Sequence, residues 1–153
     1  MIGSVVYETF EAFVAAVEPR LRRALAGHLP SDVVVDAVAE AFAYAWQHWD
    51  RLLLMDNPSG YLFRVAQSRS RAKAQVMVPD PDPFRLPHVE PRLGAAMRAL
   101  PTQQRSVVWL IHGCGWSYAE TAEALGISRS AVGTHLGRGM TRLRAQLGVK
   151  LNG

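Results

Sequence analysis

Apolar residues recur along most of the chain at spacings of three and four, the period of an α-helix with one buried face. This pattern predicts helices over about 4–29, from 31 or 32 to 54, from Pro58 into the seventies, over 91–99 and over 101–113. No strand-like alternation competes with it, so we expect an all-α protein. The residues expected on the buried sides of the first three helices are Phe10, Phe13, Val14, Val17, Leu21, Leu25, Val35, Val38, Phe42, Ala45, Trp46, Trp49, Tyr61, Leu62, Val65 and Ala66.

The helical pattern is interrupted at 78–91, where the sequence VPDPDPFRLPHVEP contains five prolines. Proline lacks a backbone donor and disfavours helix in the preceding residue, so this segment should be extended. We therefore predict two small helical modules, 1–76 and 91–153, joined by a Pro-rich linker over 77–90.

The segment 117–144 predicts two helices joined by a tight turn. Ser117 and Glu120 have the spacing of a capping box, which marks the start of the first helix. Gly126 suits a left-handed residue after its end, and Ser128 suits the N-cap of the second helix. One apolar stripe of that second helix consists of Val132, Leu136, Met140 and Leu143. The C-terminal module is therefore expected to contain a helix-turn-helix.

Hydrogen-bond donors and positive charge gather outside this stripe. The candidate DNA-binding residues there are Arg129, Ser130, Thr134, His135, Arg138 and Arg142. Residues 1–100 hold eleven basic and eleven acidic side chains, whereas 101–153 hold six and two, so the last third carries the whole charge of +4. An ordinary amphipathic helix pair would not need this asymmetry, which is typical of a nucleic-acid-binding module.

Other classes of function find little support in the sequence. Cys114 is the only cysteine, which excludes an internal disulfide and favours a cytoplasmic location. His112 and Cys114 are too few for a metal site, and no nucleophile–base pair or Gly-rich phosphate loop indicates an enzyme. No apolar run approaches the length of about 20 residues of a membrane span, and the start of the chain lacks a signal-peptide pattern. We expect no cofactor.

Two stretches of the chain carry a resemblance to a known family. LPTQQRSVVWL at 100–110 and WSYAETAEALGISRSAVGTHLGRGMTRLRAQLG at 116–148 resemble region 4 of the extracytoplasmic-function (ECF) group of bacterial RNA polymerase sigma factors. VDAVAEAFAYAWQHWDRL at 35–52 and NPSGYLFRVAQSRSRAK at 57–73 resemble region 2 of the same family. The resemblance implies that region 2 binds the polymerase and the −10 element, and that region 4 binds the −35 element.

The resemblance also implies roles for particular residues. Asp36 and Glu40 fall on acidic positions that dock on a coiled coil of the largest polymerase subunit, with Ala39 in place of the usual glutamine. Five residues of the second helix fall on positions that face DNA, with Gly133 where lysine is frequent: Arg129, Ser130, Thr134, His135 and Arg138. The partners implied are promoter DNA, core RNA polymerase and an anti-sigma or accessory protein.

The end of the third helix departs from the family pattern. Arg69, Arg71 and Lys73 supply charge for a DNA backbone, but Ala72 stands where the family has Asp. We also expect no aromatic residue after Tyr61 on which a flipped base could stack nearby. Promoter recognition should therefore depend mainly on region 4. Melting of the promoter DNA should be slow or should require an additional protein. The alternative is an ordinary helix-turn-helix regulator whose N-terminal module dimerises or senses a signal.

Overall fold

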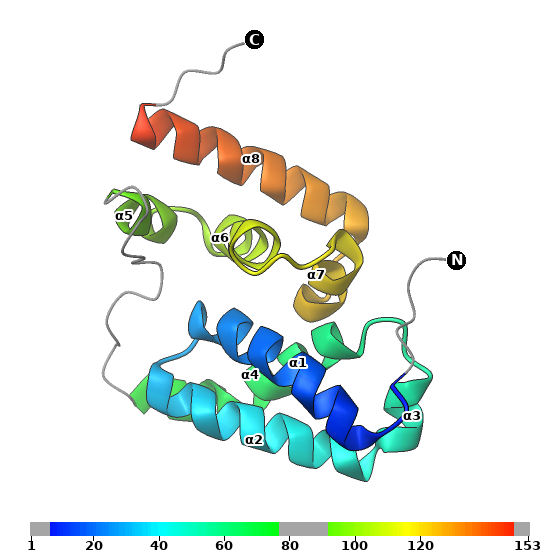
Figure 1. Cartoon of the computed structure of the whole chain (residues 1–153). Helices are drawn as coiled ribbons and strands as arrows, with labels where there is room; N and C mark the ends of the chain where they lie inside the picture. Colours follow the sequence, from blue (N-terminus) through cyan, green and yellow to red (C-terminus); the bar gives the residue numbers. More distant parts are fainter. Residues whose placement is uncertain (1–6, 77–91, 149–153) are drawn as a thin grey trace.

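The computed structural model describes residues 7–76 and 92–148, with side chains up to residue 70 in the first range, and all regular elements within these ranges are helical (Figure 1). They are α1 (Phe10–Ala26), α2 (Ser31–Gln47), α3 (Trp49–Leu53), α4 (Pro58–Val76), α5 (Leu93–Arg98), α6 (Thr102–Val108), the π-helical turn η1 (Trp109–Gly113), α7 (Tyr118–Leu125) and α8 (Arg129–Leu147). The all-α class is confirmed. The predicted linker lies outside the described residues.

The N-terminal half, 7–76, packs α2 against one side of α1 and α4 (Figure 1). Phe13, Val17 and Leu21 of α1 are almost fully buried, as their spacing predicts. The helix begins at Phe10 rather than near Ser4, because the Thr9 hydroxyl accepts a hydrogen bond from the Ala12 amide at 3.1 Å and so caps it there.

Two expectations for the second helix are wrong. The helix does not run unbroken to residue 54, because His48 leaves helical geometry between α2 and α3. Val35 and Trp46 are 68% and 63% exposed instead of buried. The buried face of α2 is made of other residues, most of them small: Val33, Val34, Ala37, Val38, Ala41 and Ala45. Val35 and Trp46 point away from that face.

The C-terminal half, 92–148, packs α5 and α6 under α8. The turn η1 widens the end of α6, so that the Cys114 amide donates to the Trp109 carbonyl five residues back. Glycine at 139 lets α8 approach α6 closely, since a Cβ there would lie 2.8 Å from Cγ2 of Val108. The C-terminal half is thereby held together around α8.

The two halves pack directly against each other, which the sequence did not predict. α7 lies on α4, and η1 lies beside the end of α1. Trp109 is 6% exposed and donates from its indole nitrogen to the Ala24 carbonyl at 3.2 Å. A Cβ at Gly27 would lie 2.3 Å from that nitrogen, so only glycine fits under the ring. The halves therefore share one continuous core.

None of the helices within 7–76 and 92–148 is long and apolar enough to cross a membrane.

Candidate nucleic-acid interface

The helix-turn-helix forms as its sequence predicts. The Ser117 hydroxyl accepts from the Glu120 amide at 3.0 Å, and the Glu120 carboxylate accepts from the Ser117 amide at 3.1 Å, so the capping box is confirmed. Gly126 has φ +66°, the left-handed conformation that costs glycine little. The Ser128 hydroxyl caps α8 by accepting from the Ala131 amide at 3.0 Å. These local features define where α7 and α8 begin and where the turn between them lies.

The outer face of α8 carries most of the predicted DNA-binding side chains. The exposed ones are Arg129, Ser130, Thr134, Arg138 and Arg142, while His135 is half-buried. Val132, Leu136 and Leu143 are buried on the opposite side, and Met140 is half-buried there. The Thr134 hydroxyl donates to the Ser130 carbonyl at 3.2 Å, which leaves its lone pairs free to accept from a base.

A shallow groove of about 450 Å³ follows this outer face. It is lined by Gly133, Thr134, Gly137, Arg138, Thr141 and Arg142. Its glycines leave the helix backbone accessible, and its arginines flank the opening. An exposed helix of this kind at the second position of a helix-turn-helix has the geometry that enters a major groove.

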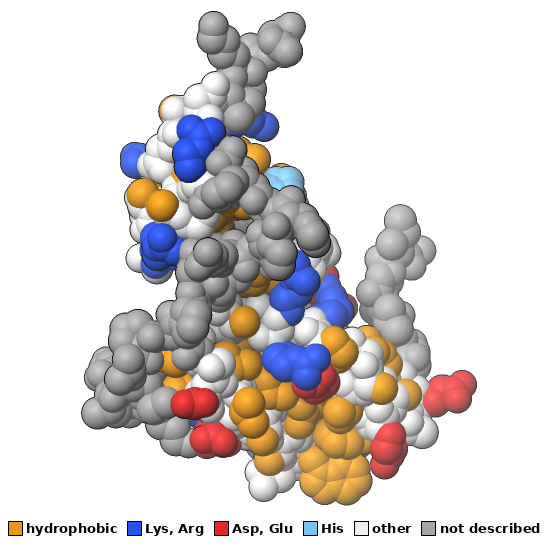
Figure 2. All heavy atoms as spheres, turned by 60° about the vertical axis from the view of Figure 1, so that its left-hand side comes forward, with side chains coloured by type: hydrophobic (Ala, Val, Ile, Leu, Met, Phe, Trp, Pro, Cys, Tyr) orange, Lys and Arg blue, Asp and Glu red, His pale blue; other side chains and the backbone are white. Residues whose placement is uncertain are grey.

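Charge is divided between the halves in space as it is in the sequence. Figure 2 shows basic side chains over the upper part of one face, where α8 lies, whereas the lower part carries acidic side chains together with further basic ones. Asp36 is exposed on α2 and Glu40, one turn later, is half-buried. In Figure 1, α2 lies across α1 and α4 from the C-terminal half, so the acidic pair and the outer face of α8 are well separated.

Arg69 is exposed on α4, with its guanidinium 5.2 Å from the ring centre of Tyr44. The hydroxyls of Tyr44 and Tyr61 are hydrogen-bonded at 2.9 Å, and this bond raises the pKa of Tyr44. The expectation that no further aromatic residue lies near the basic end of the third helix is therefore wrong, because folding brings Tyr44 there from α2. The side chains of Arg71 and Lys73 lie outside the described residues.

Charged and polar side chains also cross the interface between the halves. Arg20 of α1 donates to both oxygens of the Glu120 carboxylate, at 2.8 and 3.1 Å. Burial alone would raise the pKa of Glu120, but the hydrogen bonds from Arg20 and Ser117 and the charge of Arg20 outweigh burial and lower it. The hydrogen bond to Glu120 raises the pKa of Arg20. The local sequence around Arg20 does not identify this partner, which lies one hundred positions away.

His28 lies at the same interface. Its Nδ1 is 3.0 Å from the Ala24 carbonyl, which can only accept, so Nδ1 carries the proton of the neutral ring. Nε2 then accepts from the Ser106 hydroxyl at 3.0 Å. Burial lowers the pKa of His28, which keeps the ring neutral. No local sequence signal could have identified this contact between residues 78 positions apart.

The cysteine and its neighbouring histidine make no metal site. Cys114 is half-buried and His112 is exposed. Burial raises the pKa of the Cys114 thiol to about 11, which disfavours the thiolate that a metal requires. Across the described part of the chain, no group of three or more His, Cys, Asp and Glu side chains could hold a metal ion.

Comparisons with known proteins agree with this geometry. Residues 91–143 match the model of the family described as Sigma-70, region 4. The C-terminal part of the chain is therefore similar to region 4 of the sigma-70 family. Together with the two solved structures described next, this match supports the function of an ECF sigma factor. The predicted alternative, an ordinary regulator that does not bind polymerase, is not supported.

Two solved structures resemble the fold over 92% of this chain. One is the sigma factor RpoE from Bartonella quintana in complex with the anti-sigma factor NepR, with 22% identity over 92% of this chain and 98% of that chain and a TM-score of 0.71. The other is CnrH in complex with the cytosolic domain of CnrY, with 28% identity over 92% of this chain and 88% of that chain and a TM-score of 0.65. A comparison with curated protein sequences found no match.

Proposed function

We propose that α8 reads the −35 element from the major groove. The observation that carries this proposal is the exposed row of donors along α8 in a helix-turn-helix with both N-caps formed. Arg129 and Ser130 lie in the first turn, where a recognition helix meets base edges, and arginine can bind guanine through two hydrogen bonds. Arg138 and Arg142 lie further along α8, where they can bind phosphates.

Asp36 and Glu40 are proposed to dock this sigma factor on the polymerase. They lie one turn apart on α2, and α2 is the element of the N-terminal half that faces away from the C-terminal half (Figure 1). An acidic helix face is complementary to a basic partner surface, and such complementarity speeds association and selects the partner. The docking surface therefore remains accessible while the two halves are packed together.

The rest of the proposal concerns organisation and context. Residues 1–76 and 91–153 would act as separate modules on the promoter, with 77–90 as the linker. The protein would work in the cytoplasm without a cofactor and without catalysing a reaction. An inhibitory partner is also expected, because RpoE and CnrH were each solved with a bound protein, named in the first case as an anti-sigma factor.

A pull-down with purified core polymerase tests the docking role. The variant with Asp36→Lys and Glu40→Lys should keep its helical circular dichroism, since surface substitutions usually cost within about 0.5 kcal/mol. It should no longer be retained by the polymerase. A second variant with Glu8→Lys and Glu11→Lys changes the net charge equally at exposed positions on another part of the molecule, and it should bind normally. Normal retention of the folded Asp36/Glu40 variant would contradict the proposal.

A further inference from the structure

The ring of His28 joins the two halves of the molecule where the end of α1 meets α6. Its Nδ1 donates to the Ala24 carbonyl of α1, and its Nε2 accepts from the Ser106 hydroxyl of α6, each at 3.0 Å. The ring also meets Phe63 of α4 in an edge-to-face contact, with the ring centres 5.0 Å apart. The residue is half-buried, but both nitrogens of the neutral imidazole are used by protein partners.

The Ala24 carbonyl is a shared acceptor at this interface. It accepts from the indole nitrogen of Trp109 at 3.2 Å as well as from His28. Trp109 belongs to the C-terminal half and lies over Gly27, where a side chain would not fit. A change at His28 therefore acts on the same oxygen atom that holds Trp109 in place.

The elements around the imidazole present positive or uncharged groups. On α6 this group is Arg105, whose charge opposes a second positive charge nearby. On α1 it is Arg23, whose guanidinium donates to a backbone carbonyl of η1. The groups presented by α4 and η1 are the uncharged rings of Phe63 and Trp109. Burial lowers the pKa of His28; the bond to the Ala24 carbonyl opposes this effect and Arg105 adds to it.

We propose that His28 forms an acid-sensitive contact that holds the two halves together. When Nε2 takes up a proton from solvent, it becomes a donor that faces the donating hydroxyl of Ser106. Ser106 is only 5% exposed, so its hydroxyl has little access to water in compensation. The charged ring then favours separation of the halves, each of which remains folded. This inference goes beyond the proposed function, because it does not depend on how α8 or α2 binds a partner.

Proton linkage sets the size of the effect. In separated halves the ring of His28 is released into water and has the ordinary pKa of about 6.5, whereas its pKa in the packed protein is lower. Separation therefore takes up a proton as the pH falls below about 6.5. The ratio of separated to packed molecules rises about ten-fold by pH 5.5, and it stops rising once the packed state is itself protonated. At neutral pH the ring is neutral in both states.

Hydrogen exchange at the indole nitrogen of Trp109 measures the separation even when separated molecules are rare, since this N–H bond crosses the interface. In the full chain, its protection should fall about ten-fold between about pH 7.5 and pH 5.5, after correction for the intrinsic effect of pH on exchange. In His28→Gln, which cannot gain a charge, the protection should stay constant. The backbone amides of Leu21 and Val132, fully buried in different halves, should be better protected than Trp109 at every pH.

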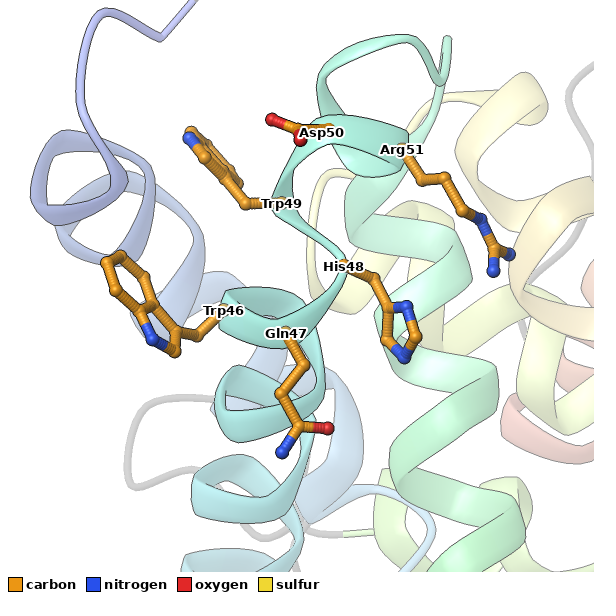
Figure 3. Close-up of a pocket in the computed structure, with 6 residues that line it drawn as sticks. All are labelled: Trp46, Gln47, His48, Trp49, Asp50 and Arg51. Carbon is orange, nitrogen blue, oxygen red and sulfur yellow. The ribbon is translucent and has the colours of Figure 1, made fainter.

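His48 supplies the matched control. It is also half-buried, but its ring lies within the N-terminal half, where it packs against Tyr44 at 4.2 Å between ring centres. Figure 3 shows His48 at the break between α2 and α3, pointing toward α4. His48→Gln should therefore keep the pH dependence of the wild type.

A second measurement needs no substitution. Nitrogen chemical shifts of the His28 ring should show a neutral imidazole at about pH 5.5 for as long as the indole N–H of Trp109 is protected. A charged ring with Trp109 still protected would overturn the proposal. The same conclusion would follow from equal pH dependence in wild type and His28→Gln, or from a protection of Trp109 as high as that of the two buried amides, since the halves would then separate only on complete unfolding.

Discussion

Arg20 and Glu120 lie one hundred positions apart and form a two-pronged ion pair, with N–O distances of 2.8 and 3.1 Å. The same carboxylate accepts the Ser117 amide in the capping box of α7. One side chain therefore serves both the start of the helix-turn-helix and its contact with the N-terminal half. A change in the contact between Arg20 and Glu120 should therefore also affect the hydrogen bonds at the start of α7.

Removal of this ion pair should lower stability. Arg20→Ala leaves a half-buried carboxylate without its strongest donor, and we expect a loss of about 1–2 kcal/mol in the free energy of unfolding. Arg22→Ala is the matched control, because Arg22 is exposed and pairs with Glu18 one turn away on the same helix. That control should cost less than about 1 kcal/mol. Denaturant titration measures the free energy of unfolding of both variants. Equal losses would show that the Arg20–Glu120 pair contributes no more to stability than the exposed pair of Arg22 and Glu18.

Stability should also depend on pH through His28. Its pKa is lowered in the folded protein, so the unfolded chain takes up a proton first as the pH falls below about 6.5, the usual value for histidine. The free energy of unfolding should therefore decrease on acidification from that pH. His28→Gln should flatten this dependence, whereas replacement of the exposed His112 by Gln should not. A curve of unchanged slope in His28→Gln would exclude His28 as its source.

Two glycines of α8 should respond oppositely to alanine. A Cβ at Gly137 meets open space, and replacing a glycine within a helix stabilises by up to about 1 kcal/mol. A Cβ at Gly139 would press on Val108, and such overpacking costs about 1–3 kcal/mol. Thermal unfolding of the two variants tests the contrast. If the side of α8 that carries Gly137 lies in the major groove, the added methyl group of Gly137→Ala should weaken DNA binding even though the protein is more stable.

DNA binding should depend on salt and on the position of each arginine along α8. Each phosphate contact contributes about 0.9 to the slope of log affinity against log salt, so Arg142→Ala should lower the slope by about that amount and weaken all sequences alike. Arg129→Ala should instead change the sequences selected from a random duplex library. Absence of duplex binding by the full chain at low salt would contradict the role of α8.

The sequence predicted those parts of the molecule that depend on neighbouring residues. The capping box of Ser117, the left-handed Gly126 and the N-cap Ser128 are local features, and each is confirmed. The exposed donors of α8 follow from the same periodicity. Their contacts with DNA, and those of Asp36 and Glu40 with polymerase, remain predictions.

The features that the sequence missed depend on residues distant in the chain. Val35 and Trp46 were expected inside because they are apolar, but α2 uses its smaller residues to approach α1 and α4 closely. The hydrogen bond between Tyr44 and Tyr61 depends on the packing of α2 against α4, which the local sequence does not reveal. The expectation of slow promoter melting rested partly on the absence of such a ring, and it loses that support.

The positions of the tryptophans make the fluorescence of this protein sensitive to the contact between its two halves. Trp109 and Trp116 are 6% and 2% exposed and are buried where the halves meet, whereas Trp46 is 63% exposed to water. Separation of the halves would bring two indole rings from an apolar environment into solvent. Emission should then shift to longer wavelength, and a shift on binding polymerase would follow opening in real time without any attached dye.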